Sequence, residues 1–90
     1  MQKLKSWTKF FKAIKAGEKT HDLRSKKDRD YEIGERLLLQ EYDPFSGTYT
    51  GDACVVEVTY ITDDVTPCAF SSAVLDKGYC ILSIKVVKEI

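Results

Sequence analysis

The sequence predicts an α+β domain in which an N-terminal helix packs on a small curved sheet, mixed or antiparallel, or on a small β-barrel. Three observations lead to this fold class. The chain has 90 residues, which is the size of one small domain. An amphipathic helical stripe lies close to the N-terminus, and the later apolar segments are rich in β-branched residues. Short turns separate those segments, so we expect four to six neighbouring strands.

The first expected element is a helix over residues 7–16, which begins after Ser6, a suitable N-cap. Its apolar positions recur at i, i+3, i+4 and i+7, which places four side chains on one face: Trp7, Phe10, Phe11 and Ile14. Gly17 is a natural stop at the C-terminal end. We therefore expect these four side chains to pack into the core rather than to form a platform for a ligand.

After the helix, residues 18–24 are expected to be short and extended, and the charged residues 25–30 to form an exposed loop. Gly34 indicates a turn into a strand over residues 35–42, whose three consecutive leucines indicate that both faces are partly covered. The sequence Asp-Pro-Phe-Ser-Gly at 43–47 has strong turn chemistry. The chain is therefore expected to reverse direction directly after this strand.

A second turn is expected at Gly51-Asp52, after a short segment over 48–50. Residues 53–61 have the strongest strand pattern, because they are rich in valine, tyrosine, threonine and isoleucine with alternating polar positions. Residues 62–76 are expected to be a loop with a helical turn around 71–75. Residues 78–87 are expected to be the final strand.

The formal net charge is zero, from 14 basic and 14 acidic side chains. This balance argues against a domain that binds nucleic acid by phosphate attraction alone. Basic side chains outnumber acidic ones before Arg36, whereas residues 43–64 contain acidic side chains and no lysine or arginine. An anionic ligand is therefore expected near the N-terminal part. A local cleft is favoured over a long groove that follows a nucleic-acid backbone.

The cysteines are Cys54, Cys68 and Cys80, an odd number without CxxC spacing, and the chain has one histidine. These features argue against a zinc site, and the apolar surroundings of Cys54 and Cys80 favour buried thiols. Free thiols fit a reducing cytoplasm. The sequence lacks an apolar signal core, a run of roughly 18–20 apolar residues and a glycine-rich phosphate loop. We expect a cytoplasmic protein without a membrane segment, a metal or a cofactor.

The densest group of polar side chains lies directly after the expected helix, from Gly17 to Arg24. On an extended chain every second side chain shares a face, which would put Asp22 and Arg24 together and Lys19 on the other side. A bend after Gly17 would instead bring Lys19 toward them. Lysine and arginine at such a place can bind a phosphate or a carboxylate, and an aspartate can orient them or act as an acid or base. Charged residues after a helix are, however, more often simply solvated.

The spacing Gly17-x-Lys19-x-x-Asp22-x-Arg24 resembles the GxKxxExR motif of ASCH domains, part of the PUA-like superfamily, with aspartate in place of glutamate. The motif follows the first helix, as it does in that family. Further segments are similar to a small bacterial and phage branch of ASCH-like proteins: residues 3–5, 28–31, 33–35, 41–43, 49–51 and 78–84. The resemblance implies a small β-barrel with helices and a cleft beside the first helix.

The resemblance also implies that the cleft binds RNA, other single-stranded nucleic acid, or a nucleoside or nucleotide, through Lys19, Asp22 and Arg24. An alternative follows from it, because a few small ASCH proteins are amidohydrolases that deacylate N4-acetylcytidine with a lysine and a threonine of the motif and a distant glutamate. Lys19 matches the lysine, Asp22 stands at the threonine position, and residues 62–76 contain no glutamate. In an enzyme, Lys19 and Asp22 would be catalytic. A third alternative is a protein-interaction or host-modulating factor of phage origin.

Two further residues are secondary candidates for the same cleft. Arg29 could line it, or could hold its loop through ion pairs with the aspartates on either side. Tyr31 could stack on a base, although a partly buried structural role is more common for such a tyrosine and for Tyr42. His21, the only histidine, is expected to lie at the surface or to support a site residue from behind, and no nucleophile for a catalytic triad is near it in the sequence.

Overall fold

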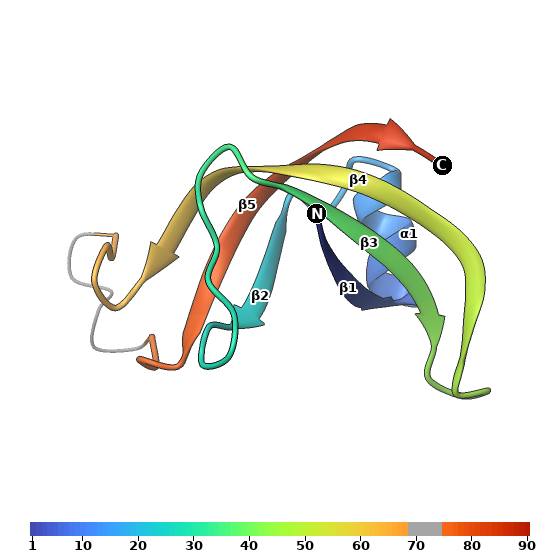
Figure 1. The fold of residues 1–90 in the computed structure, drawn as a ribbon, viewed down its shortest axis with the longest axis horizontal. Coiled ribbons are helices and arrows are strands. Elements are labelled where there is room, and N and C mark those ends of the chain that lie inside the picture. Colours follow the sequence, from blue (N-terminus) through green and yellow to red (C-terminus); the bar gives the residue numbers. More distant parts are fainter. Residues whose placement is uncertain (69–74) are drawn as a thin grey trace.

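The structure, a computed structural model, describes residues 1–68 and 75–90. Its elements are β1 (Gln2–Trp7), α1 (Thr8–Lys15), β2 (His21–Ser25), β3 (Arg36–Asp43), β4 (Thr48–Asp63) and β5 (Tyr79–Glu89) (Figure 1). The five strands form one sheet in the order β1-β3-β4-β5-β2. β1 runs parallel to β3, and the other neighbours are antiparallel. The prediction of a small α+β fold with a mixed sheet is confirmed.

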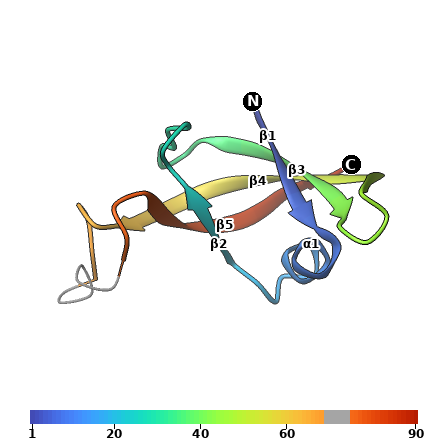
Figure 2. The ribbon, with the colours of Figure 1, turned by 90° about the horizontal axis from the view of Figure 1, so that it is seen from below.

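The sheet curls because its central strands are long and irregular. β4 has 16 residues, and its register shifts once against β3 and twice against β5. Such bulges bend a strand and increase its twist. In Figure 1 the strands β3, β4 and β5 arch over the molecule, and Figure 2 shows α1 and β2 beneath them. The curled sheet is a half-barrel with β1 and β2 as its edges.

The core fills the side of the sheet that α1 covers. Its buried residues come from α1 and from four strands: Leu4, Phe11, Ile14, Leu37, Leu39, Cys54, Val56, Val58, Cys80, Leu82 and Ile84. The thiols Cys54 and Cys80 are buried in it, as predicted. β3 alternates buried and partly buried residues, so both of its faces are at least partly covered, as its leucine run predicts. Within the described ranges, no helix is long and apolar enough to cross a bilayer.

The sequence does not predict β1, and the expectation that Ser6 caps the first helix is wrong. Ser6 is buried inside β1, where it shares the inward face with Leu4, and the helix starts at Thr8 with Trp7 at the N-cap position. Leu4 is the only large apolar residue among the inward positions of this strand, and lysines occupy outward positions, as is common at a sheet edge. The strand therefore carries little hydrophobic periodicity, and its pairing with β3 defines it.

Half of the expected apolar stripe lies outside the core. Phe11 and Ile14 are buried as predicted, but Trp7 is 52% exposed and Phe10 is 44% exposed. Trp7 precedes the helix in an extended conformation (φ −62°, ψ 142°), so its side chain leaves the helical face. Phe10 lies on the flank of a helix of only eight residues. The prediction that all four side chains pack into the core is therefore wrong for these two aromatic residues.

The predicted turn at Gly51-Asp52 is wrong, because both residues lie inside β4. Gly51 adopts φ +95° where the pairing of β3 with β4 shifts register, so the glycine permits a bulge instead of a reversal. The turn predicted at 43–47 is confirmed. Asp43 Oδ1 accepts a hydrogen bond from the Phe45 N–H at 2.9 Å, and Gly47 has φ +72°. β3 and β4 thus form one long hairpin, whose tip projects at the lower right of Figure 1.

The chain after β4 begins with a tight turn. Asp63 Oδ1 accepts hydrogen bonds from the N–H groups of Val65 and Thr66, and Asp63 Oδ2 pairs with Lys26 Nζ at 3.1 Å. These partners, the Thr66 N–H first, lower the pKa of Asp63 to about 2. The ion pair ties the end of β4 to the chain that follows β2. Residues 71–74 of the expected helical turn lie outside the described residues.

Candidate functional site

The motif after α1 is held by β2 at the edge of the half-barrel. Gly17 takes φ +79°, which turns the chain away from the helix. β2 then pairs with β5, with Asp22 opposite Leu82 and Arg24 opposite Cys80. Because Leu82 and Cys80 belong to the core, Asp22 and Arg24 start from the same, inward face of β2. The prediction that these two side chains share a face is confirmed.

Asp22 is the common acceptor of two cations. Arg24 Nε donates to Asp22 Oδ2 at 2.8 Å, and Lys19 Nζ lies 3.9 Å from Asp22 Oδ1. Lys19 Nζ also donates to the carbonyl of His21. The three charged side chains are only 15–21% exposed. The bend after Gly17 therefore brings Lys19 to Asp22, as one of the two sequence expectations proposed, and forms a shielded ionic cluster.

Two arginines donate hydrogen bonds to β1: Arg24 from the other edge strand, β2, and Arg29 from the segment that follows it. Arg24 Nη2 donates to the Lys5 carbonyl at 2.9 Å, and Arg29 Nη1 donates to the Lys3 carbonyl at 3.0 Å. Both acceptors belong to β1, a strand that pairs only with β3 in the sheet. Carbonyl groups on the open edge of a sheet need partners from outside the ladder. The guanidinium groups supply these partners, and they hold the half-barrel together where no strand pairing does.

The structure places the five predicted site residues in two adjacent hollows. Lys19 and Asp22 line a hollow of about 230 Å³, together with Phe10 and Leu23. The predicted residues of the second hollow, of about 210 Å³, are Arg24, Arg29 and Tyr31, and its other lining residues are Leu4, Lys5, Ser25 and Asp28. The Asp22–Arg24 ion pair connects the two hollows. We call the two hollows together the edge cleft.

The second hollow is electropositive. Its lining includes three cations, Lys5, Arg24 and Arg29, and one carboxylate, Asp28. A guanidinium has five N–H donors, and the bonds of Arg24 to Asp22 and to the Lys5 carbonyl use two of its nitrogens. Further donors of both arginines can therefore reach an anion. Burial raises the pKa of Tyr31, against the opposing effect of Arg24 and Arg29, so its hydroxyl stays protonated at neutral pH.

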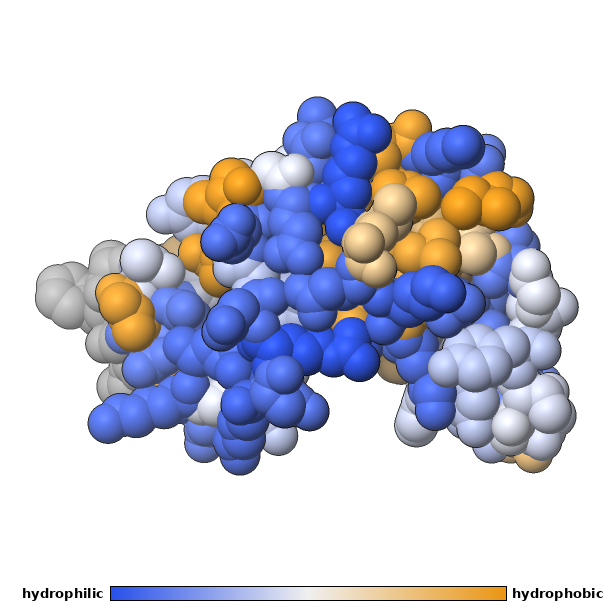
Figure 3. All heavy atoms as spheres, in the orientation of Figure 1, coloured by the Kyte–Doolittle hydropathy of each residue, from blue (hydrophilic) through white to orange (hydrophobic). Residues whose placement is uncertain are grey.

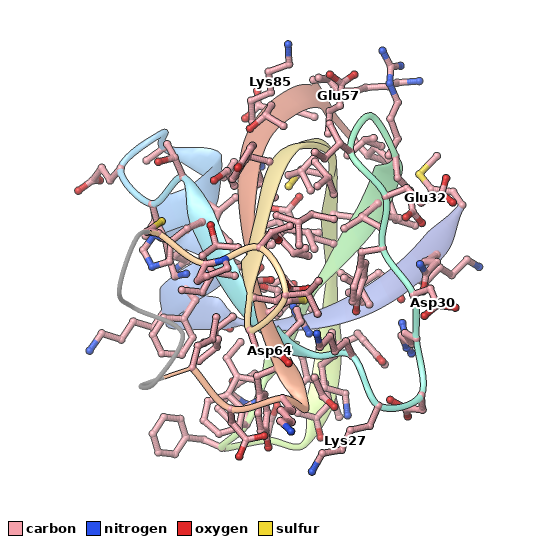
Figure 4. The ribbon with its side chains drawn as sticks, turned by 90° about the vertical axis from the view of Figure 1, so that its left-hand side faces the viewer. Lys27, Asp30, Glu32, Glu57, Asp64 and Lys85 are labelled. Carbon is pink, nitrogen blue, oxygen red and sulfur yellow. The ribbon has the colours of Figure 1, made fainter. Side chains whose placement is uncertain are left out.

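Arg29 has a structural contact in addition to its place in the second hollow, and Tyr42 and His21 lie outside the edge cleft. Arg29 holds its loop through the Lys3 carbonyl, and the neighbouring carbonyl of Asp30 accepts a hydrogen bond from Gln2 Nε2 at 2.8 Å. In Figure 4, Asp30 and Glu32 lie on this segment after β2. Tyr42 is partly buried, as predicted, and lies edge-on to Tyr49 with a centroid distance of 5.2 Å. His21 is exposed, as predicted.

Two features of the site region are absent from the sequence prediction. One is Glu41, a carboxylate only 5% exposed, which accepts a hydrogen bond from Thr50 Oγ1 at 2.7 Å. Its spacing from Leu37 and Leu39, every second residue of β3, is the signal that places it inward. The other is a groove of about 620 Å³ beside the start of α1: Trp7, Thr8, Lys9, Phe10, Lys12, Asp43, Pro44 and Phe45. Here the available signal is Phe45, an aromatic residue within a turn.

The cysteines and carboxylates do not gather into a cation site in the described ranges. Among residues 1–68 and 75–90, no group of three or more His, Cys, Asp or Glu side chains is placed to hold a metal ion. Burial raises the pKa of both Cys54 and Cys80. These thiols therefore stay protonated at neutral pH and act as small apolar core residues.

Sequence comparison finds a similar protein in a phage. It is 35% identical over 63 residues to the "Uncharacterized 12.9 kDa protein in GpA 3'region" of Escherichia phage P2. The match covers 70% of this chain and 55% of that protein, so the chain spans little more than half the length of this relative. Residues 1–84 match the family described as "Domain of unknown function (DUF3850)". Because this match covers most of the sequence, the chain belongs to the DUF3850 family.

Proposed function

We propose that this protein is an ASCH-like, PUA-like binding module that takes RNA, single-stranded nucleic acid or a nucleotide in the edge cleft. The observation that carries the proposal is that three charged side chains of the motif converge. Lys19 and Arg24 meet on Asp22 in a cluster that is only 15–21% exposed, and this cluster borders both hollows. Shielded cations with spare donors are suited to a phosphate or a base carbonyl, because partial burial strengthens their hydrogen bonds.

The size of the cleft favours a small unit of nucleic acid. The two hollows measure about 230 and 210 Å³, each below the roughly 300–1,000 Å³ of a typical ligand pocket. A nucleoside monophosphate would therefore extend across both hollows. Phe10 in the first hollow and Tyr31 in the second offer faces for a base, and Lys5, Arg24 and Arg29 offer charge for a phosphate. A rigid duplex has no comparable fit in such small recesses.

The PUA-like part of the proposal is supported by two features. The sheet curls into a half-barrel, and the edge cleft includes Phe10 of α1, so it lies beside the first helix as the resemblance implies. The aspartate that replaces the motif glutamate keeps its role as an acceptor, because Asp22 already binds Arg24. The exchange shortens the carboxylate arm by one methylene group without removing the ion pair.

A binding titration tests the proposed function. Cytidine and uridine 5′-monophosphates and a labelled eight-nucleotide RNA are the probes. Lys19→Ala should weaken binding of both probe types about tenfold or more, since a hydrogen bond from a charged group contributes roughly 1.5–3 kcal/mol. Lys77→Ala is the matched control, because Lys77 is an exposed lysine outside the edge cleft. Unchanged binding by a folded Lys19→Ala protein would move the site elsewhere.

A further inference from the structure

The groove between the start of α1 and the tip of the β3–β4 hairpin exposes three aromatic side chains. Trp7 is 52% exposed, Phe10 is 44% exposed and Phe45 is 99% exposed, and all three line the same groove of about 620 Å³. In Figure 3 the tip of the β3–β4 hairpin forms a pale lobe at the lower right. Aromatic side chains gathered in this way indicate a surface that meets a partner.

The groove also carries unused positive charge. Lys9 and Lys12 lie on its rim, and within the described residues neither is paired with a carboxylate. Its one carboxylate, Asp43, accepts hydrogen bonds from the N–H groups of the hairpin turn, at Phe45 and Ser46. The free cations beside aromatic faces are complementary to a ligand that is both anionic and flat.

Phe10 connects the groove to the edge cleft. It lines the groove together with Trp7, and it also lines the hollow that contains Lys19 and Asp22. A ligand chain that leaves the cleft past Phe10 therefore enters the groove that Trp7 and Phe45 also line. The groove and the edge cleft therefore meet at Phe10, close to the start of α1.

We propose that this groove is a stacking site for bases of a single-stranded nucleic acid whose phosphates lie along Lys9 and Lys12. The inference rests on the proposed function and adds a second contact region to it. Single strands bind where aromatic faces take successive bases and cations follow the backbone. An acidic peptide would satisfy the lysines, but it offers no flat faces to three exposed aromatic rings. Single-stranded nucleic acid satisfies both features of the groove.

Trp7 makes the inference directly measurable, because it is the only tryptophan of the chain. The wild-type protein is titrated with an eight-nucleotide oligouridylate, with an abasic oligomer of the same length, and with an acidic peptide. Base stacking should quench Trp7 emission with oligouridylate, and the abasic oligomer, which has the same phosphates and no bases, should leave it nearly unchanged. Equal quenching by the abasic oligomer, or quenching by the peptide alone, overturns the inference, as does failure of oligouridylate to bind.

Substitutions of residues in the groove provide a second test of base stacking. Phe45→Ala should weaken oligouridylate binding roughly five- to 100-fold, the range for loss of one stacked base. Its matched control is Tyr60→Ala, because Tyr60 is also exposed, at 54%, but lies on β4 outside the groove. The double variant with Lys9→Gln and Lys12→Gln should reduce the slope of log K against log salt by about 1.4, since each phosphate contact contributes about 0.7 on a single strand. Lys77→Gln is the control for charge.

Mononucleotide binding separates this inference from the proposed function. Phe45→Ala should leave uridine 5′-monophosphate binding unchanged, whereas Lys19→Ala should weaken it. If Phe45→Ala binds oligouridylate as tightly as the wild type while Lys19→Ala does not, the groove is not a stacking site, and the proposed binding in the edge cleft is retained. If Phe45→Ala loses oligouridylate binding and Lys19→Ala changes the binding of neither oligouridylate nor uridine 5′-monophosphate, the groove is a stacking site and the proposed binding in the edge cleft is wrong.

Discussion

The edge cleft and the groove beside α1 use their polar groups in opposite ways. In the cleft, Asp22 binds two cations, and Arg24 and Arg29 bind carbonyls of β1. In the groove, Lys9 and Lys12 have no carboxylate partner within the described residues. The motif residues of the cleft therefore support the fold, and the proposed ligand would use the same side chains. The exposed groove residues carry no comparable structural duty.

Because of this difference, mutations in the two regions should differ in whether they change stability. Removing Arg24 should change stability and the proposed binding together, because the same guanidinium joins the edge strands and lines the second hollow. Removing Phe45 changes only the surface, since its side chain is almost fully exposed.

The largest expected effect is the contrast between Phe11 and Phe10. Phe11 is fully buried in the core, so Phe11→Ala should lower the free energy of unfolding by roughly 3–5 kcal/mol. Phe10 is 44% exposed, so Phe10→Ala should cost about 1 kcal/mol or less. Urea denaturation of the two variants measures this difference. Equal losses would mean that Phe10 belongs to the core after all and that the groove is narrower than described.

An intermediate effect is expected for the arginine that bridges the edge strands. Arg24→Ala removes one ion pair and one bond to a carbonyl, and it leaves Asp22, 15% exposed, without its nearest cation. Loss of a hydrogen bond from a charged group costs roughly 1.5–3 kcal/mol, so the free energy of unfolding should fall by about that amount. Chemical denaturation monitored by circular dichroism checks it.

Arg36→Ala is the matched control for this prediction. Arg36 also pairs with a carboxylate, Glu57, but at 3.6 Å and with its side chain 61% exposed. In Figure 4, Glu57 lies beside Lys85, whose side chain is also 61% exposed. Exposed pairs contribute roughly 0–1 kcal/mol, so the control should change stability little. If Arg24→Ala were as mild as Arg36→Ala, the guanidinium bridges would not hold the half-barrel together.

The sequence predicts the parts of the fold that have strong periodicity. β3, the centre of β4 and β5 appear where valine, isoleucine and leucine recur, and the turn at 43–47 appears where its residues dictate it. β1 is not predicted because it has one large inward apolar residue and forms by pairing with β3. Gly51 is misread because glycine serves a turn and a bulge equally well, and only the register of the partner strand decides between them.

The candidate site is predictable to the same extent. The spacing of Asp22 and Arg24 on an extended strand is local, so their shared face follows from the sequence alone. The bridges to β1 are not local, because they join residues 19 and 26 positions apart, and their acceptors are backbone carbonyls that leave no trace in side-chain composition. The sequence does not predict the groove beside α1, for a related reason. Whether an aromatic residue of a helical stripe is buried depends on how wide a surface the sheet offers.

The smallest expected effect concerns catalysis in the edge cleft. Deacylation of N4-acetylcytidine needs a nucleophile, a base to accept its proton, and a stabiliser for the developing oxyanion. Asp22 stands where the resembling enzymes have a hydroxyl, and its carboxylate is held by Arg24 at 2.8 Å, with Lys19 beside it. A carboxylate fixed between two cations is a poor nucleophile, and Lys19 Nζ already donates a hydrogen bond to the His21 carbonyl. We therefore expect turnover at the background rate, measured by chromatography of released cytidine.

Rapid turnover that disappears in Lys19→Ala but persists in Lys77→Ala would make the cleft an active site, and the ionic cluster would then be its resting state rather than a binding surface.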